Sequence, residues 1–259
     1  MRLLRNKALV FYSISFALIL IFASILYADI RIKDTKHNLS ASGPGTVHAQ
    51  EEDQICIFCH SPHNNLPLSG QPLWNHNLSS QNYKVYWSNQ VLSYTYEESQ
   101  SWNVDGTSSK LCLSCHDGTV AIGSVNSEIE EIAMSLSECI DGSGKLVATC
   151  PGYLGTDLSG GHPISIVLDQ NLIDARVSNG LSSIRIPNDT YVKLYPKPGC
   201  SGRCSVQCTS CHDPHVNRAI GDDPDDETNH NWPPFWQKEY YNDVCEACHD
   251  PIPPANFEW

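Results

Sequence analysis

The chain has 259 residues, of which 12 are Cys and 11 are His, and only 17% are charged. It is too short for several large domains and too rich in cysteine for an ordinary cytosolic enzyme. Its net charge of -13 is opposite in sign to that of a nucleic-acid-binding protein. Much of the hydrophobic content lies near the N-terminus, so the remainder is poor in the aliphatic residues that fill a core. We therefore expect something other than side chains to supply apolar volume.

An export signal is predicted at the N-terminus. Arg2, Arg5 and Lys7 precede a nearly unbroken apolar run over residues 8–27, which ends next to the small residue Ala28. This order is typical of a signal segment over residues 1–28 that is removed on export. The run is also long enough to span a bilayer, so an uncleaved segment would anchor the protein to a membrane. In both cases residues 29–259 lie outside the cytoplasm.

Four C-x-x-C-H frames dominate the rest of the chain, and we number them in chain order: frame 1 (residues 56–60), frame 2 (112–116), frame 3 (208–212) and frame 4 (245–249). In such a frame two thiols add to the vinyl groups of one haem, and the following imidazole ligates the iron. A zinc site or a set of disulfides would not require His after every second Cys. The sequence therefore predicts four covalently attached haem c groups. The attaching cysteines are Cys56, Cys59, Cys112, Cys115, Cys208, Cys211, Cys245 and Cys248, and the attachment histidines are His60, His116, His212 and His249.

Four haems also define the expected fold class. Ser, Asn, Gly, Pro and Asp dominate between the frames, which favours loops. We expect mostly irregular coil with short helices and a few short strands, wrapped round a covalent haem chain, and folding that depends on haem attachment. The regular elements predicted are a hairpin from residues 183–186 and 190–195, a strand over 163–168 and a helix over 236–248.

Each iron needs a second axial ligand, and histidine is expected because Met134 is the one methionine of the exported region. An internal repeat divides residues 29–259 into two dihaem units, at about 37–138 and 162–250. Each unit holds one H-x-[LI]-S, one C-x-x-C-H-x-P-H and one C-x-x-C-H-D. The repeat selects four distal ligands: His37, His63, His162 and His215.

Sequence distance adds a constraint on His63 and His215. A residue three positions after an attachment histidine lies on the same side of that haem, so each of these two must serve a neighbouring iron. His76 stays an alternative ligand. His48 and His230 are expected to be solvated or hydrogen-bonded.

Four cysteines lie outside the frames, in an insertion of the second unit. In an oxidising compartment they most simply pair as Cys139 with Cys150 and Cys200 with Cys204, although three pairings are open to them. Metal binding is the alternative, but no histidine lies at ligand spacing beside them. The acidic run at residues 222–227 lacks the spacing of a calcium loop and is expected to be solvated surface.

Taken together, these motifs resemble the doubled C-x-x-C-H multihaem cytochromes of metal-reducing bacteria, and within them the tetrahaem subunits that polymerise into extracellular cytochrome nanowires. The resemblance rests on residues 37–40, 56–63, 73–76, 112–117, 161–163 and 208–215. It implies a continuous haem chain along a filament of identical subunits, in which an axial histidine of one subunit completes a haem in the next. His37, near the mature N-terminus, is the candidate for that ligand. The insertion between Cys139 and Cys204 has no counterpart in the family pattern.

The sequence thus predicts an electron carrier and not an enzyme. Its partners are other redox proteins and further copies of the chain, on the cell surface or outside the cell. A soluble periplasmic shuttle is the alternative. A multihaem reductase would need an iron with an open position, and seven spare histidines for four vacancies argue against one. A membrane-anchored quinol-oxidising cytochrome is suggested only by the long apolar run, and such proteins lack the paired units found here.

Overall fold

A computed structural model of the protein describes residues 30–62, 73–85, 104–181, 183–199, 201–217, 235–238 and 240–249. The chain divides into two compact units, Met1–Ile30 and Arg31–Trp259, and the second carries all four frames. The predicted export segment, residues 1–28, lies outside the described residues, as do His63, Cys200, the acidic run and His230. Within the described ranges, no helix combines the length and the apolar character needed to cross a membrane.

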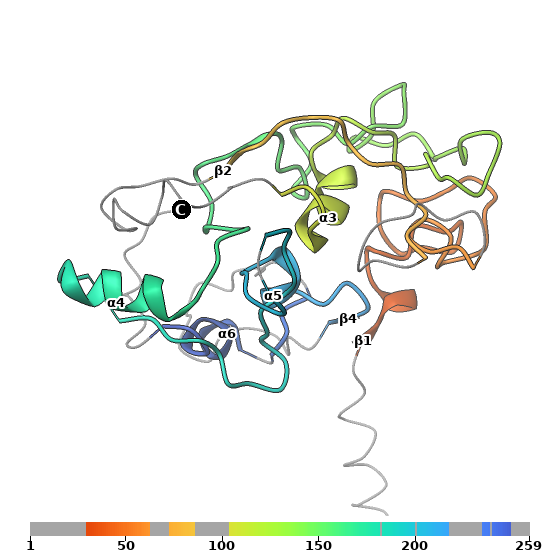
Figure 1. Cartoon of the computed structure of the whole chain (residues 1–259). Helices are drawn as coiled ribbons and strands as arrows, with labels where there is room; N and C mark the ends of the chain where they lie inside the picture. The colour runs from red at the N-terminus through yellow and green to blue at the C-terminus, as the bar shows by residue number, and fades with distance from the viewer. Residues whose placement is uncertain are drawn as a thin grey trace, which may run out of the picture. The chain divides into compact units, whose positions relative to one another are not determined.

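Short elements separated by long coil make up the second unit (Figure 1). In chain order they are β1 (Ile30–Arg31), the 3-10 helix η1 (Ile32–Asp34), β2 (Lys84–Val85), α3 (Ser108–His116), β3 (Asp157–Leu158), α4 (Gln170–Ser178), α5 (Cys208–Cys211), β4 (Val216–Asn217) and α6 (Tyr241–Glu246). β1 pairs with β4, and β2 pairs in parallel with β3. The predicted mostly irregular coil with few short helices and strands is confirmed, whereas its wrapping round haem stays a prediction.

The predicted hairpin is wrong. Ile184 forms an isolated β-bridge with His249, and Tyr195 forms one with Ser205. The alternating pattern does mark extended, half-buried chain, but its backbone partners are segments distant in sequence and not the neighbouring run.

Two other predicted elements are shorter than expected. In residues 163–168 only Val167 takes part in an isolated bridge, because Ser165 adopts a φ of 59°, which interrupts an extended strand. The predicted helix over 236–248 is reduced to α6. The helices α3 and α4 were not predicted from the pattern.

Buried apolar side chains form three separate clusters among the described residues. One surrounds Phe58 and Leu146, a second surrounds Leu172 of α4, and a third surrounds Leu113 of α3. α4 begins at Asp169, whose side chain accepts a hydrogen bond from the Leu172 backbone N–H at 2.9 Å. Helices α3 and α5 pack against each other.

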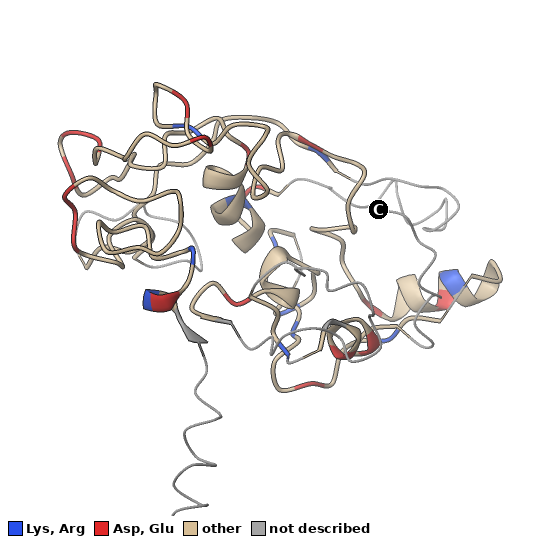
Figure 2. Ribbon diagram, turned by 180° about the vertical axis from the view of Figure 1, so that it is seen from behind, with Lys and Arg blue, Asp and Glu red and all other residues tan. Residues whose placement is uncertain are grey.

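Charged side chains lie on the loops and the helices (Figure 2). The chain holds 29 acidic and 16 basic residues, so acids dominate. The Lys84 ammonium lies 3.0 Å from the Asp157 carboxylate across the pair of β2 and β3, and both side chains are exposed. Such exposed pairs contribute little to stability.

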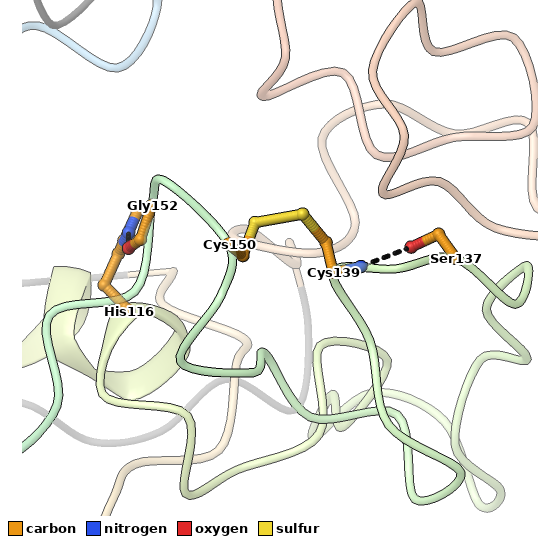
Figure 3. The surroundings of a disulfide bond; sticks show 5 residues. All are labelled: His116, Ser137, Cys139, Cys150 and Gly152. Atoms are coloured by element: carbon orange, nitrogen blue, oxygen red, sulfur yellow. Dashed lines mark hydrogen bonds between the residues drawn. A yellow bond between two sulfur atoms is a disulfide. The ribbon is translucent and has the colours of Figure 1, made fainter.

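A disulfide joins Cys139 to Cys150, as predicted (Figure 3). Cys139 is buried in the cluster around Phe58, and its backbone N–H donates to the Ser137 hydroxyl at 3.3 Å. Cys204 is also disulfide-bonded, and its predicted partner Cys200 lies outside the described residues. The bond between Cys139 and Cys150 closes a loop, and the carbonyl of Gly152, just after this loop, lies next to His116 of frame 2.

Replacing Cys139 and Cys150 together by Ser should lower the free energy of unfolding by about 2 to 3 kcal/mol, since a short closed loop loses its constraint on the unfolded chain. Denaturant titration of the oxidised protein measures this loss. Ser143→Ala, on the exposed turn within the same loop, is the matched control and should leave the midpoint unchanged. Equal stability of the double variant and the wild type would contradict the assignment.

Candidate haem attachment sites and their histidines

Each frame forms a helical turn, whether or not it lies inside a helix. In frames 1, 3 and 4 the histidine N–H donates to the carbonyl of the first cysteine, and frame 2 lies within α3. The donor–acceptor distances are 2.7 Å for His60 to Cys56, 3.0 Å for His212 to Cys208 and 2.9 Å for His249 to Cys245. Positions i, i+3 and i+4 of a helical turn lie on one face. The two thiols and the imidazole of each frame therefore lie on the same side of the turn.

The frame cysteines are all free thiols, in contrast to Cys139 and Cys150. Burial raises the pKa of Cys59, Cys115 and Cys211 to about 12. These thiols are therefore protonated at neutral pH and resist oxidation, because the thiolate is the reactive form. Thioether attachment requires two free thiols in each frame, which is the state of these cysteines.

Frames adjacent in sequence are also adjacent in space. Besides burial, the neighbouring thiol Cys115 helps to raise the pKa of Cys59, which places frame 1 beside frame 2. Cys112 and Cys208 share a side-chain hydrogen bond, which places frame 2 against frame 3. Cys248 and Cys245 likewise contribute to the raised pKa of Cys211, which places frame 3 beside frame 4. The four attachment sites thus follow one another in chain order.

The contact between frames 2 and 3 is built from buried hydroxyl and amide groups. The Ser109 hydroxyl donates to the Gln207 side-chain oxygen at 2.6 Å and accepts from the Cys208 N–H at 3.0 Å. The Ser108 and Thr209 hydroxyls lie 2.6 Å apart. These bonds fix α3 against α5, so the two frames are held together by the polypeptide itself.

Imidazole rings face each other in three pairs, each of one attachment histidine and one predicted distal ligand. The ring centroids are 6.0 Å apart for His60 and His215, 6.0 Å for His37 and His116, and 6.1 Å for His162 and His249. Two imidazoles on opposite sides of one metal ion are separated by two metal–nitrogen bonds of roughly 2 Å each and two ring radii, or about 6 Å in all. The three pairs therefore have the spacing that a shared iron requires.

His215 faces His60 of frame 1 and not the histidine of its own frame, His212. This arrangement agrees with the constraint that a residue three positions after an attachment histidine serves a neighbouring iron. By the repeat, His63 would serve frame 3 in the same way, but it lies outside the described residues.

The Nδ1 atoms of four paired histidines lie next to oxygen acceptors. The acceptors are the carbonyls of Pro214 for His37 (3.4 Å), Gly152 for His116 (2.6 Å) and Pro163 for His162 (2.9 Å), and the Asp213 carboxylate for His215 (3.2 Å). A carbonyl or carboxylate oxygen accepts, so Nδ1 carries the proton and Nε2 keeps its lone pair. A hydrogen bond of this kind also orients a metal-bound imidazole and raises its basicity. The residues present therefore fit a haem iron.

Burial favours the neutral form of two of the paired imidazoles, those of His37 and His249. It lowers the pKa of His37 to about 4, with a further contribution from His116. Burial lowers the pKa of His249 to about 4 as well, with a contribution from His162. Both rings are neutral at pH 7, which is the form that binds a metal.

The remaining histidines are placed differently. His76 is fully buried, and its Nδ1 and Nε2 lie 2.8 Å and 3.1 Å from the carbonyl oxygens of Asn77 and Ala121. With both nitrogens engaged, the alternative that His76 ligates an iron is not supported. His48 lies 2.9 Å from the Ala49 carbonyl through Nδ1, as expected for a hydrogen-bonded side chain. His37 has a partner within its own chain, which argues against its predicted role as a ligand for a second subunit.

Two tripeptides, of which only the first belongs to the motifs that carry the resemblance, are hydrogen-bonded to frames 1 and 3. We call residues 73–75 clamp 1 and residues 235–237 clamp 2. Each clamp accepts a backbone hydrogen bond from the residue after the attachment histidine and donates one to the second cysteine of the frame. The side-chain amides of Asn75 and Gln237 donate to the carbonyls of Ile57 (2.6 Å) and Thr209 (3.1 Å), which occupy equivalent frame positions. The signal was present as P-[LF]-W-[NQ], which occurs at residues 72–75 and 234–237.

No group of three or more His, Cys, Asp or Glu side chains in the described ranges is arranged to hold a metal ion directly. Comparison with known proteins shows no protein family that matches the chain. It also shows no curated protein of significant similarity. The functional argument therefore depends on the frames, the imidazole pairs and their surroundings.

The pairing predicts opposite results for two histidine substitutions. His162→Ala should leave one iron with an open position and produce one high-spin haem among the four, because it removes the one ring that faces His249 in the described part of the chain. His76→Gln is the matched control, and it should keep every haem low-spin. Absorption spectra and magnetic circular dichroism of the ferric proteins distinguish the two spin states. A high-spin haem in His76→Gln, or none in His162→Ala, would reverse the assignment.

Proposed function

We propose that the protein is an exported tetrahaem c-type cytochrome that carries electrons outside the cytoplasm. The observation that carries this proposal is the set of three imidazole pairs, each joining an attachment histidine to a histidine distant in sequence at 6.0 to 6.1 Å. A disulfide framework or a zinc protein would have no need for these pairs. The frames supply the covalent attachment, and the pairs supply both axial positions.

The side chains perform three tasks in this function. The frame cysteines would hold each macrocycle in place, and the paired imidazoles would ligate the iron and exclude substrate and water from it. Bound haem iron supplies reversible one-electron oxidation and reduction. Oxygen acceptors at Nδ1 orient four of these imidazoles and leave Nε2 available. Ligation by histidine alone, without methionine, favours low reduction potentials.

The succession of frames supports transfer along a line. Frame 1 lies near frame 2, frame 2 near frame 3 and frame 3 near frame 4, so each site has a neighbour to which an electron can pass. The second dihaem unit also supplies a ligand to the first, because His215 faces His60. This contribution favours one connected series of haems over two separable halves.

Surface charge bears on the partners. Acidic residues occur along the loops of the described chain (Figure 2), and the whole chain has a net charge of -13. Such a surface repels small anionic substrates and attracts redox partners with basic docking surfaces. This argues against a reductase of nitrogen or sulfur oxyanions and for a carrier that meets other proteins.

Filament assembly, as the resemblance implies, remains part of the proposal. The cis partner of His37 removes one expected means of joining subunits, and a soluble periplasmic shuttle is then the simpler alternative. Electron microscopy of protein recovered from the cell exterior distinguishes the two. Regular filaments would favour a nanowire subunit, and discrete particles found in the periplasm would favour the shuttle.

Carbon monoxide tests whether the protein is a carrier or an enzyme. Three sites have two imidazoles each, and His63 is the expected second ligand of the fourth, so the absorption spectrum of the fully reduced protein should not change when carbon monoxide is added. The His162→Ala variant provides the positive control, since its open iron should bind the gas. A carbon monoxide adduct in the wild-type protein would contradict the carrier function and favour an enzyme with an open haem.

A further inference from the structure

Clamp 2 contacts the histidines of two different frames. The Phe235 ring stacks on the His37 imidazole, with centroids 4.2 Å apart and planes 15° from parallel. The adjacent Trp236 stacks on the His212 imidazole at 4.5 Å and 24°. His37 faces His116 of frame 2, whereas His212 belongs to frame 3. Two consecutive residues thus lie flat against imidazoles that serve neighbouring haem sites.

Backbone hydrogen bonds attach both ends of clamp 2 to frame 3 and to the residue that follows it. The Phe235 carbonyl accepts from the Asp213 N–H at 2.8 Å, and the Gln237 N–H donates to the Cys211 carbonyl at 2.8 Å. The Gln237 side chain adds its bond to the Thr209 carbonyl at 3.1 Å. The two aromatic rings are therefore tied to the same turn that carries the attachment cysteines.

Two unfavourable features coincide in this tripeptide. Phe235 has a φ of 75°, a left-handed conformation that is costly for a residue with a bulky side chain. The Trp236 indole N–H is buried and has no acceptor among the described residues. Strained backbone and unsatisfied polar groups are concentrated at functional sites, where they hold a required geometry. Here the geometry held is that of the rings against His37 and His212.

Clamp 1 is an internal comparison with the same backbone. Leu73 also has a left-handed φ, of 72°, and the buried Trp74 N–H also lacks an acceptor in the described chain. However, Leu73 is half exposed, and Trp74 meets His60 edge-on at 6.3 Å and 88°. Among the described residues, clamp 1 therefore contacts the imidazole of one frame only, and it stacks on none.

We infer that Phe235 and Trp236 are positioning residues that fix the ring planes of His37 and His212, the axial ligands at frames 2 and 3. This inference rests on the proposed haem function. Frames 2 and 3 are also the pair whose cysteines, Cys112 and Cys208, share a hydrogen bond. Clamp 2 thus controls ligand orientation on both sides of this contact between frames 2 and 3.

Electron paramagnetic resonance of the ferric protein reports these ring planes directly. The angle between the two axial imidazole planes sets the splitting of the iron d orbitals. Crossed planes give a large maximum g value, and parallel planes give a rhombic signal. Phe235→Leu should shift the maximum g value of one low-spin haem, and Trp236→Leu should shift that of a different haem. Phe235→Tyr and Trp236→Phe keep the stacking and should restore the wild-type signals.

Trp74→Leu is the matched control and should leave both of those signals at their wild-type positions. The number of haems per chain is measured by intact mass on every sample. If a leucine variant does not accumulate, Phe235→Met or Trp236→Met replaces it with the same expectation, since methionine fills the space without a ring.

Wild-type signals in both leucine variants, each carrying four haems, would overturn the positioning role. If both leucine variants shifted the maximum g value of one and the same haem, this result would also overturn the positioning role. A wild-type protein that carries no haem would instead overturn the proposed function, so the two failures are distinguishable.

Discussion

The pairing of two imidazoles across about 6 Å is the constraint on which the rest of the structure depends. One ring of each pair is fixed to a frame, and the other comes from a distant part of the chain, as His37 does for frame 2 and His215 for frame 1. An iron held between the two rings would therefore close a long loop. With three described pairs, such irons would fix coil that has little regular secondary structure at several points. The small apolar clusters and the disulfide between Cys139 and Cys150 then stabilise the loops between those points.

Local structure and hydrogen bonds together position the side chains of these pairs. A helical turn places two cysteines and a histidine on one face of each frame. Hydrogen bonds such as that from His116 Nδ1 to the Gly152 carbonyl leave Nε2 available. Gly152 lies just after the loop that the disulfide closes (Figure 3). The disulfide, although it lies outside the frames in the sequence, therefore helps to position the histidine of frame 2. Clamps 1 and 2 brace frames 1 and 3 in equivalent ways.

Much of the site could be predicted from the sequence, because the chemistry of thioether attachment dictates a fixed local spacing. The repeat likewise singled out His37, His162 and His215, which the structure brings opposite attachment histidines. Which histidine faces which frame could not be predicted, since these contacts are long-range and leave no local pattern.

Secondary structure was predicted less well for a related reason. The extended segment at Ile184 finds its backbone partner in frame 4 and not in the neighbouring run, and α3 buries Ser and Lys side chains together with Leu113, so its sequence lacks an amphipathic stripe. The role of the clamps could not be predicted, although residues 73–76 belong to the resemblance, because the number of residues between a frame and its clamp varies and the hydrogen bonds between them are long-range.

Electron paramagnetic resonance of the ferric wild-type protein tests the pairing of histidines most directly. The planes of His60 and His215 are 15° apart, whereas those of His37 and His116 and of His162 and His249 are 69° and 88° apart. The pairing therefore predicts low-spin haems only, with one rhombic signal from the near-parallel pair and two signals of large maximum g value from the crossed pairs. Spectra without low-spin haem, or without any signal of large maximum g value, would contradict it.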